Sequence, residues 1–377
     1  MHKFVFIYGF ALFGMFFGAG NLVFPLQIGQ SAGEYWALGA FGLTITGIIL
    51  PFLGLFVIKL YRGNYLSFFG GAGSFAKHFL PFFTLSLLGS FGGMPRCVAI
   101  AYGGINRVAP ISLGCFSVIF CVATYCICLK KQRLIDVVGK WLTPILVLFL
   151  VVLISLCARH SGESAGVAEA SAATALIGGL TTGYQTMDVL AAFFFSSMIF
   201  LQIKKTMPEE STDEDVLKVS IKAGALACAL LAAVYSGMVF MGAKFAYLTK
   251  NVNPSEMFVA ISESVLGNYA AFFIGATVML ACFTTVVALN DIYARYLHSL
   301  LKLKEDNFKF ILLGTTATAF IMSLLDFRGI TKFLVPVLDV LYPSVIALTL
   351  VSLFSQKPSA LKKALFYATA AAMLLFS

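Results

Sequence analysis

Apolar residues fill long continuous stretches of this chain, and short polar segments separate them. The stretches are about 20 residues long, the length at which a helix crosses a bilayer. A transmembrane β-barrel would instead alternate in polarity within segments of about ten residues. The pattern therefore predicts an all-α polytopic membrane protein, because a helix satisfies its own backbone hydrogen bonds in lipid. We place eleven spans, near residues 4–29, 33–58, 78–105, 109–129, 137–157, 172–203, 219–243, 256–297, 307–325, 331–354 and 360–377.

The composition supports this class and limits the alternatives. Of the 377 residues, 60% are hydrophobic and 11% are charged, and the mean hydropathy is +0.93. A water-soluble core of this size could not cover so much apolar surface. The eight cysteines lie inside or at the ends of apolar stretches without a C-x-x-C pair, so we interpret them as small core residues.

Basic residues are distributed unevenly between the two sides of the predicted bundle. The loops on the side of Lys3 carry 19 of the 26 Lys and Arg residues, the opposite loops carry six, and Arg96 lies within the third span. The positive-inside rule therefore places the N-terminus in the cytoplasm. The same bias explains the formal net charge of +9 without a nucleic-acid partner. Because the first apolar stretch continues past its "GAG", we expect an uncleaved span rather than a signal peptide.

The first span is interrupted by the stretch "FFGAGNLVFP". Its glycines, Gly18 and Gly20, weaken a helix, although small residues also allow close helix packing in membranes. Asn21 and Pro25 favour the first interpretation, because a polar amide at bilayer depth needs a partner and a proline frees a carbonyl one turn back. We therefore predict an unwound turn inside the first span.

The sixth span is interrupted in a comparable way by the polar patch from Thr181 to Asp188. Spans one and six are equivalent if the chain consists of two five-span halves facing opposite ways across the membrane. Paired broken helices in inverted halves indicate a secondary transporter with a binding site at mid-membrane. We place the first repeat at 1–160, the second at 161–355 and a partial C-terminal span at 356–377.

Broken helices expose backbone groups that suit a zwitterion. Free N–H groups near Gly20 and Leu22 favour a carboxylate, and free carbonyls at the end of a half-helix favour a cation. Such a site needs no buried charged side chain. The phenylalanines and methionines around the breaks suggest an amino acid with an apolar side chain.

The eighth span contains "ACFTT". The hydroxyls of Thr284 and Thr285 could simply bond to carbonyls one turn earlier. Together with the carbonyl of Ala281 they could also form a cluster of hard oxygen ligands for sodium. The residues alone leave both interpretations open.

Three separated motifs carry a resemblance to a known family. "FALFGMFFGAGNLVFPLQIGQSAG", "TTGYQTMDVLAAFFF" and "LVPVLDVLYPSVIALTLVSL" resemble the bacterial branched-chain amino acid:cation symporters, the transport system II carriers, and weaker similarity extends over nearly the whole chain. The resemblance implies the five-plus-five inverted repeat of the bacterial leucine transporter. It also implies import of leucine, isoleucine and valine across the bacterial inner membrane, driven by sodium or protons without another cofactor.

The resemblance also implies roles for individual residues. The implied sodium ligands are the carbonyls of Gly14, Phe17 and Ala281 and the hydroxyls of Thr284 and Thr285. The implied substrate-binding residues are Gly18, Ala19, Gly20, Asn21, Tyr184, Gln185, Thr186, Met187 and Asp188.

Several questions stay open from the sequence. Asp188 could carry a proton or cap the second half of span six. Arg96 could pair with a carboxylate or line a water path. The family usually has twelve spans, and this sequence stops within the eleventh, so a non-transporting sensor or partner protein is an alternative to a symporter. A membrane enzyme is excluded by the lack of a catalytic cluster in the sequence. The expected partners are the small-molecule substrate and the lipid bilayer, and the oligomeric state is open.

Overall fold

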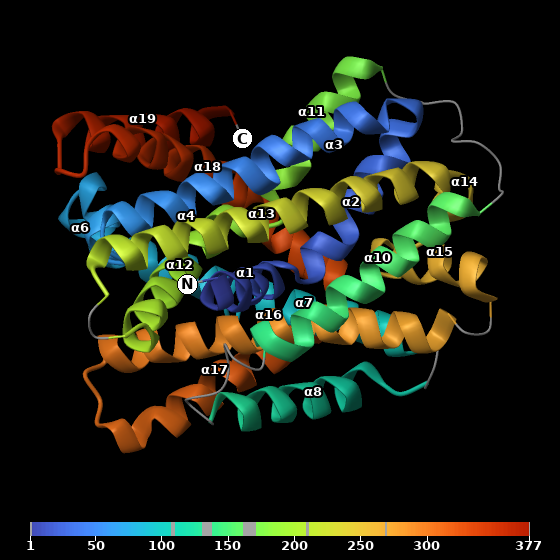
Figure 1. Ribbon diagram of the computed structural model, residues 1–377, viewed down its shortest axis with the longest axis horizontal. Helices are drawn as coiled ribbons and strands as arrows, with labels where there is room; N and C mark the ends of the chain where they lie inside the picture. The colour runs from blue at the N-terminus through green and yellow to red at the C-terminus, as the bar shows by residue number, and fades with distance from the viewer. Residues whose placement is uncertain are drawn as a thin grey trace.

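The computed structural model describes residues 2–106, 110–129, 138–160, 171–208, 211–267 and 270–376. Within these ranges all regular elements are helical (Figure 1), as the hydrophobic pattern predicts. In the described part of the chain, seven helical runs are long and apolar enough to cross a membrane. The count of eleven spans stays a prediction. The helices are α1 (His2–Phe16), α2 (Ala19–Ala32), α3 (Trp36–Thr44), α4 (Leu50–Leu60), α5 (Tyr65–Phe69), α6 (Ser74–Leu88), α7 (Gly93–Asn106), α8 (Leu113–Cys128), α10 (Thr143–Arg159), α11 (Ala172–Tyr184), α12 (Asp188–Thr206), α13 (Asp213–Lys244), α14 (Ala246–Thr249), α15 (Met257–Leu266), α16 (Ala270–Leu300), α17 (Phe308–Ser323), α18 (Asp326–Phe354) and α19 (Ala360–Phe376).

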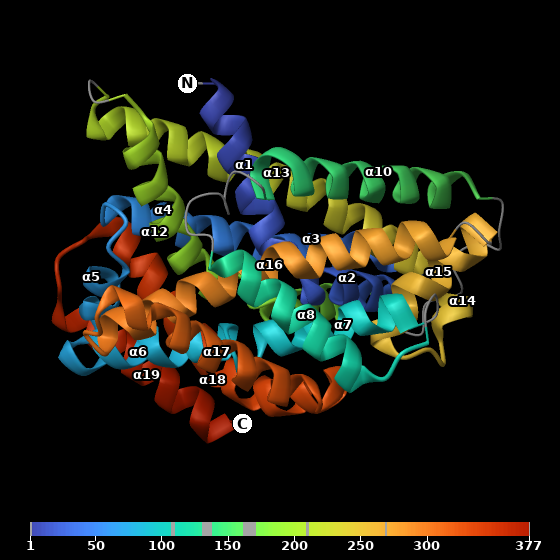
Figure 2. The same cartoon turned by 90° about the horizontal axis from the view of Figure 1, so that it is seen from below.

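Most of the long helices run roughly along the long axis of the molecule (Figures 1 and 2). α13 packs against both α1 and α2, α11 packs against α3, and α12 packs against α4. Every residue of α12 from Asp188 to Ser197 is buried. The outer helices α8 and α10 instead expose apolar side chains such as Ile119 and Leu148, which suits contact with lipid tails.

The first span is broken, which confirms the predicted unwinding. α1 ends at Phe16 and α2 begins at Ala19, with Gly18 in an extended conformation (φ −117°, ψ −154°). The break is shorter than expected, because Gly20 and Asn21 already belong to the first turn of α2. Pro25 lies inside α2, where it has no N–H to donate to the carbonyl one turn back.

The sixth span is also broken where the polar patch predicts it. α11 ends at Tyr184, and α12 begins at Asp188. Between them Met187 has φ 65° and ψ 11°, a left-handed conformation that residues other than glycine rarely adopt. The unwound segment is therefore only 185–187, narrower than the predicted patch.

The third span contains a break that the sequence analysis did not predict. We expected one helix over 78–105, but α6 ends at Leu88 and α7 begins at Gly93. A Cβ on Gly92 or Gly93 would lie 2.5 or 2.3 Å from a carbonyl oxygen of the preceding turn. Glycine is therefore required here, and this turn positions Arg96 at the start of α7.

The predicted eighth span, 256–297, is also two helices rather than one. α15 ends at Leu266, and Gly267 follows with φ +56°, a conformation that favours glycine and stops the helix. α16 begins at Ala270, so residues 268–269 of this prediction lie outside the described part of the chain.

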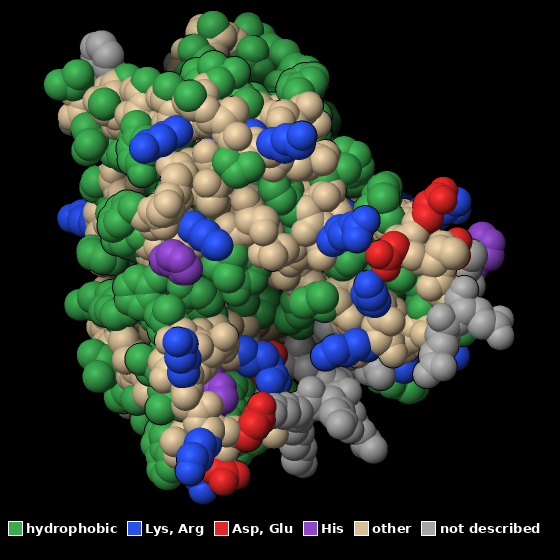
Figure 3. Space-filling view, turned by 90° about the vertical axis from the view of Figure 1, so that its left-hand side faces the viewer, with side chains coloured by type: hydrophobic (Ala, Val, Ile, Leu, Met, Phe, Trp, Pro, Cys, Tyr) green, Lys and Arg blue, Asp and Glu red, His purple; other side chains and the backbone are tan. Residues whose placement is uncertain are grey.

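Lys and Arg side chains gather on one end of the molecule (Figure 3). Two of the lysines that the charge count assigned to loops are buried, so that assignment is wrong for them. Lys59 donates to the carbonyl of Ser220 at 2.5 Å, and Lys362 donates to the hydroxyl of Tyr61 at 2.9 Å. Four other counted residues lie outside the described ranges: Arg107, Lys130, Lys131 and Arg133.

Candidate functional site

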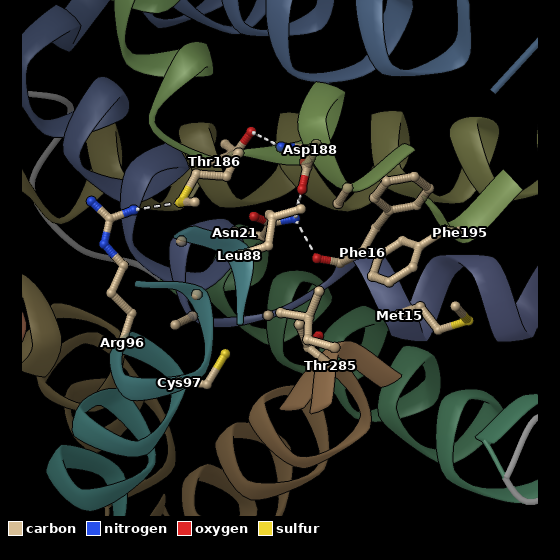
Figure 4. Close-up of a pocket in the computed structure, with 17 residues that line it drawn as sticks. Met15, Phe16, Asn21, Leu88, Arg96, Cys97, Thr186, Asp188, Phe195 and Thr285 are labelled. Atoms are coloured by element: carbon tan, nitrogen blue, oxygen red, sulfur yellow. Dashed lines mark hydrogen bonds between the residues drawn. The ribbon is translucent and has the colours of Figure 1, made fainter. Parts of the chain in front are cut away.

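A pocket lies where the two broken spans meet the third and eighth spans (Figure 4). Apolar side chains form part of its wall, namely Met15, Phe16, Leu88 and Phe195. Most of the residues that the resemblance assigns to the substrate also line it: Gly18, Ala19, Gly20, Asn21, Thr186, Met187 and Asp188.

The carboxylate of Asp188 connects the two broken spans. It accepts hydrogen bonds from Asn21 Nδ2 at 3.2 and 3.4 Å and from the Tyr235 hydroxyl at 2.9 Å. The interpretation of Asp188 as a helix cap is wrong, because Met187 occupies the N-cap position of α12. The backbone N–H of Asp188 itself donates to the hydroxyl of Thr186 at 3.4 Å. The carboxylate points instead toward α2 and α13.

Asn21 stabilises the first break. Besides reaching Asp188, its Nδ2 donates to the carbonyl of Phe16 at 2.9 Å, so it satisfies an acceptor at the end of α1. The amide is buried, and its two hydrogen bonds are the partners that a polar group needs at this depth. Asn21 therefore anchors the turn, as the sequence suggests.

Arg96 is the second charged side chain of the pocket. Its Nη1 donates to the carbonyl of Gln185 at 3.0 Å and contacts the sulfur of Met187 at 3.5 Å. Its Nη2 donates to the hydroxyl of Thr331 at 3.3 Å. The guanidinium also lies against the ring of Phe24, with Cζ 5.6 Å from the ring centre. The site thus differs from the expected one, because it does contain buried charged side chains.

Two of the implied substrate residues lie apart from the pocket lining. Tyr184 ends α11 and packs against the ring of Tyr342, with ring centres 5.2 Å apart. Gln185 contributes its backbone carbonyl to Arg96.

Four of the residues implied for sodium, Gly14, Ala281, Thr284 and Thr285, lie together beside the first break. The carbonyl of Gly14 accepts from the hydroxyls of Thr284 at 2.8 Å and Thr285 at 3.2 Å. The Thr284 hydroxyl also lies 2.9 Å from the Leu280 carbonyl and 3.1 Å from the Ala281 carbonyl. It thus bonds one turn back, as the first interpretation expects, and also reaches the broken span. The interpretation as a sodium site stays a prediction.

The position of Phe17 is defined by the contacts of its aromatic ring. The ring is fully buried, stacks on Phe13 with centres 5.2 Å apart and lies 6.3 Å from the ring of Tyr235. A further hydroxyl, that of Thr143 in α10, faces Gly14, because a Cβ there would lie 2.1 Å from it. This hydroxyl is buried and has no hydrogen-bond partner among the residues that the structure describes.

The contacts of Tyr235, Thr331 and Thr143 with site residues were not predicted from the sequence. Nothing in a single apolar helix distinguishes a tyrosine or threonine that contacts a site residue from one that packs elsewhere. The position of Arg96 did carry a signal, since "GSFGGMPR" combines glycines and a proline as the first span does.

Comparison with known proteins identifies relatives over the full length. The family model described as "Branched-chain amino acid transport protein" matches residues 1–377. The branched-chain amino acid permease BrnQ of Bacillus subtilis (strain 168) is 29% identical over 362 residues, which cover 92% of this chain and 80% of that protein.

Solved transporter structures share the fold. Mhp1, a nucleobase-cation-symport-1 family transporter in a closed conformation with bromovinylhydantoin bound, matches with a TM-score of 0.65 and 18% identity, covering 99% of this chain and 90% of that one. MhsT in complex with L-phenylalanine matches with a TM-score of 0.62 and 17% identity, covering 98% and 97%. The overall fold is therefore that of transporters of the leucine-transporter type. The five-plus-five inverted repeat and the number of spans stay predictions. The relative and both structures are transporters, which confirms the prediction that the chain is not an enzyme.

Proposed function

The chain belongs to the branched-chain amino acid transport protein family, and we propose that it is a secondary active symporter for leucine, isoleucine and valine. It is a multi-pass membrane protein of a bacterial family, with seven helical runs able to span a bilayer. We place it in the bacterial inner membrane with the N-terminus in the cytoplasm. The basic end face of Figure 3 would then face the cytoplasm, as the positive-inside rule requires.

One observation carries the proposal: both broken spans meet at a single pocket that has an apolar wall and opposite charges. A branched aliphatic side chain suits Phe16, Leu88 and Phe195, while the polar residues suit the ammonium and carboxylate groups. The start of α2 adds backbone N–H groups that favour an anion. The pocket therefore fits a small apolar amino acid.

Sodium is the proposed coupling ion, held by Gly14, Phe17, Ala281, Thr284 and Thr285. The Thr284 hydroxyl has one proton, yet three carbonyl oxygens lie within 3.1 Å of it. This excess of acceptors favours a hard cation, for which carbonyl and hydroxyl oxygens are suitable ligands. The Gly14 carbonyl belongs to the same broken span as the pocket, so ion binding would stabilise one arrangement of that span.

The cycle that we propose is alternating access in a chain of two five-span repeats, 1–160 and 161–355. The first two spans of each repeat, α1 to α4 and α11 to α13, would rock against a scaffold that includes α7 and α16, exposing the pocket to each side in turn. A sodium ion and an amino acid bound together would favour the same state, and this shared preference couples their transport.

Uptake into proteoliposomes tests the proposal. Purified full-length protein should accumulate labelled leucine when an inward sodium gradient is imposed, and unlabelled isoleucine and valine should compete. Liposomes without protein and protein with the gradient dissipated are the controls. Accumulation driven by a proton gradient alone would show that the coupling ion is the proton rather than sodium. No accumulation under either gradient would overturn the symporter and favour a non-transporting protein of the same fold.

A further inference from the structure

We propose that Arg96 recognises the carboxylate of the transported amino acid, with Asp188 facing its ammonium group from another wall of the same pocket. This assignment rests on the proposed function, because it names the residues that select the substrate class. The first observation is the state of Arg96, which is only 2% exposed. Among the described residues, no carboxylate lies within ion-pair distance of its guanidinium, and its hydrogen-bond acceptors are the neutral groups of Gln185, Met187 and Thr331.

Within the described part of the chain, the Nε of Arg96 is a buried donor without a hydrogen-bond partner. Removing a cation from water is costly unless an anion and a full set of hydrogen bonds replace the solvent. Two neutral oxygens, a sulfur and the faces of Phe24 and Phe327 meet that need only in part. The guanidinium therefore favours an anionic ligand, and a carboxylate matches its planar fork.

Arg96 and the start of α2 border the same pocket, so an anion bound there would meet both. Arg96 lines the same cavity as Gly18, Ala19 and Gly20, which form the N-cap and first turn of α2. The N-terminus of α2 alone would attract an anion weakly, since a helix end acts as about half a charge. With Arg96 beside it, the two features supply a full positive charge and backbone donors to one carboxylate.

Asp188 provides the opposite charge. Its side chain is buried, and its hydrogen-bond donors, Asn21 and Tyr235, are neutral. No ion pair joins it to Arg96 among the described residues, and Figure 4 shows the two side chains at different sides of the pocket. A zwitterion supplies one countercharge to each of them, whereas an amine or a carboxylic acid leaves one buried charge unmatched. The class selected is thus the α-amino acids with neutral side chains.

Two aromatic rings hold the guanidinium in place. The Cζ of Arg96 lies 5.6 Å from the ring centres of both Phe24 in α2 and Phe327 in α18. Such contacts are attractive and restrict the side chain, so less conformational entropy is lost when a carboxylate binds. Lysine has no planar face of this kind and cannot make two parallel hydrogen bonds.

Ligands that lack one charged group test the assignment. Binding of leucine, leucinamide and 4-methylpentanoate to the purified full-length protein is measured by competition with labelled leucine for the wild type and directly by calorimetry for variants. Leucinamide keeps the ammonium group and loses the carboxylate charge, and 4-methylpentanoate does the reverse. In the Arg96→Gln variant, leucine affinity should fall by about 10- to 100-fold, because a charge-assisted hydrogen bond is lost. Leucinamide affinity should change by less than about threefold, within the usual scatter of a single contact.

The reciprocal variant and a matched control separate recognition from damage. Asp188→Asn should lower the affinity for leucine and leucinamide but leave the affinity for 4-methylpentanoate unchanged. Lys59→Gln removes another buried cation, 2% exposed and outside the pocket, and should leave all three affinities unchanged. If Arg96→Gln does not fold, Arg96→Lys keeps the charge and should lose leucine affinity selectively but to a smaller extent.

Two results would overturn the assignment: equal loss of leucine and leucinamide affinity in Arg96→Gln, or unchanged leucine affinity in that variant. A wild-type protein that binds no branched-chain amino acid but binds another one refutes the proposed function alone, and the same variants are then compared on that amino acid and its amide. A wild-type protein that binds no zwitterionic amino acid refutes both.

Discussion

In each of the two broken spans a backbone carbonyl at the break accepts a hydrogen bond from a side chain, but the two donors differ in charge and in distance along the chain. In the first, the carbonyl of Phe16 accepts from Asn21, a neutral amide five residues away in the same span. In the sixth, the carbonyl of Gln185 accepts from Arg96, a cation that is 89 residues away in another span. The end of the first half-helix is therefore bonded by a side chain of its own span. The sixth-span break has a local contact as well, from the Thr186 hydroxyl to the Gly183 carbonyl at 2.9 Å, but it also needs a donor from another span.

This difference decides how each break responds to a change. Loss of the amide at the first break leaves buried neutral groups unpaired, which costs the usual desolvation energy. Loss of the cation at the second break also changes the charge balance of the pocket. Asp188 connects the two breaks, so it is the residue at which the comparison is tested most strongly.

The largest effect is expected for Asp188→Ala. The substitution leaves Asn21 Nδ2 with one acceptor fewer and the Tyr235 hydroxyl buried without its acceptor. We expect a loss of about 2 to 6 kcal/mol of stability, from two weakened or unpaired buried donors. The measurement is the apparent melting temperature of purified protein in detergent. Asp188→Asn keeps one acceptor oxygen and should lose less; equal melting temperatures for the two variants would contradict this connection.

A smaller loss of stability is expected for Asn21→Ala, which removes the side-chain hydrogen bonds of the first break and leaves those of Arg96 in place. The carbonyl of Phe16 loses its side-chain donor, while the bond between Arg96 and Gln185 is unaffected. The expected loss is about 2 to 3 kcal/mol, since one buried acceptor and one carboxylate lose a donor. Melting temperature is again the readout. Leucine should still protect the variant against heating, and a complete loss of that protection would show that the two breaks are not independent.

The next change addresses the ion beside the first break. Thr285→Ala removes a hydroxyl 3.2 Å from the Gly14 carbonyl. The sodium concentration for half-maximal leucine uptake should rise by about tenfold, or 1.4 kcal/mol, while the ranking of leucine, isoleucine and valine stays the same. Thr318→Ala, an exposed hydroxyl in α17, is the control. Equal loss of sodium dependence and substrate selectivity would argue against Thr285 as an ion ligand.

The smallest loss of stability is expected for Tyr235→Phe, which removes only the hydrogen bond that Asp188 accepts from α13. One hydrogen bond of 2.9 Å is removed, and the ring contact with Phe17 remains. The loss should be about 1 kcal/mol, the net value of a single hydrogen bond, or slightly more because the acceptor is a carboxylate. A melting temperature as low as that of Asp188→Ala would mean that Tyr235, rather than Asn21, holds the carboxylate.

The same comparison explains what the sequence could and could not predict. The break at Gly18 depends on neighbouring residues, so glycines, an amide and a proline within one short stretch reveal it. The polar patch before Asp188 reveals the sixth-span break in the same way. Some partners of these breaks come from helices distant in sequence. The glycines and the proline before Arg96 indicate an irregular turn there, but no local signal shows that Arg96 or Tyr235 faces the breaks.

The third span was misjudged for a related reason. Its glycines lie in a long apolar stretch, where close helix packing is an equally good explanation. Only the structure shows that a Cβ at Gly93 would meet the carbonyl of Leu88 at 2.3 Å. The overall helical class was predictable because hydrophobicity is a property of whole segments, whereas a break depends on a few atoms.

The hydrogen bond between Asn21 and Asp188 also has a consequence for the order in which the protein is made. The two residues are 167 positions apart, so at a synthesis rate of about 5 to 20 residues per second the partner of Asn21 arrives on the order of ten to thirty seconds later. During that interval the first span already lies in or near the bilayer with its amide side chain. The carbonyl of Phe16, five residues away, is available at once. It gives one of the two amide N–H groups a partner from the start, so only the second N–H remains for Asp188 of the sixth span.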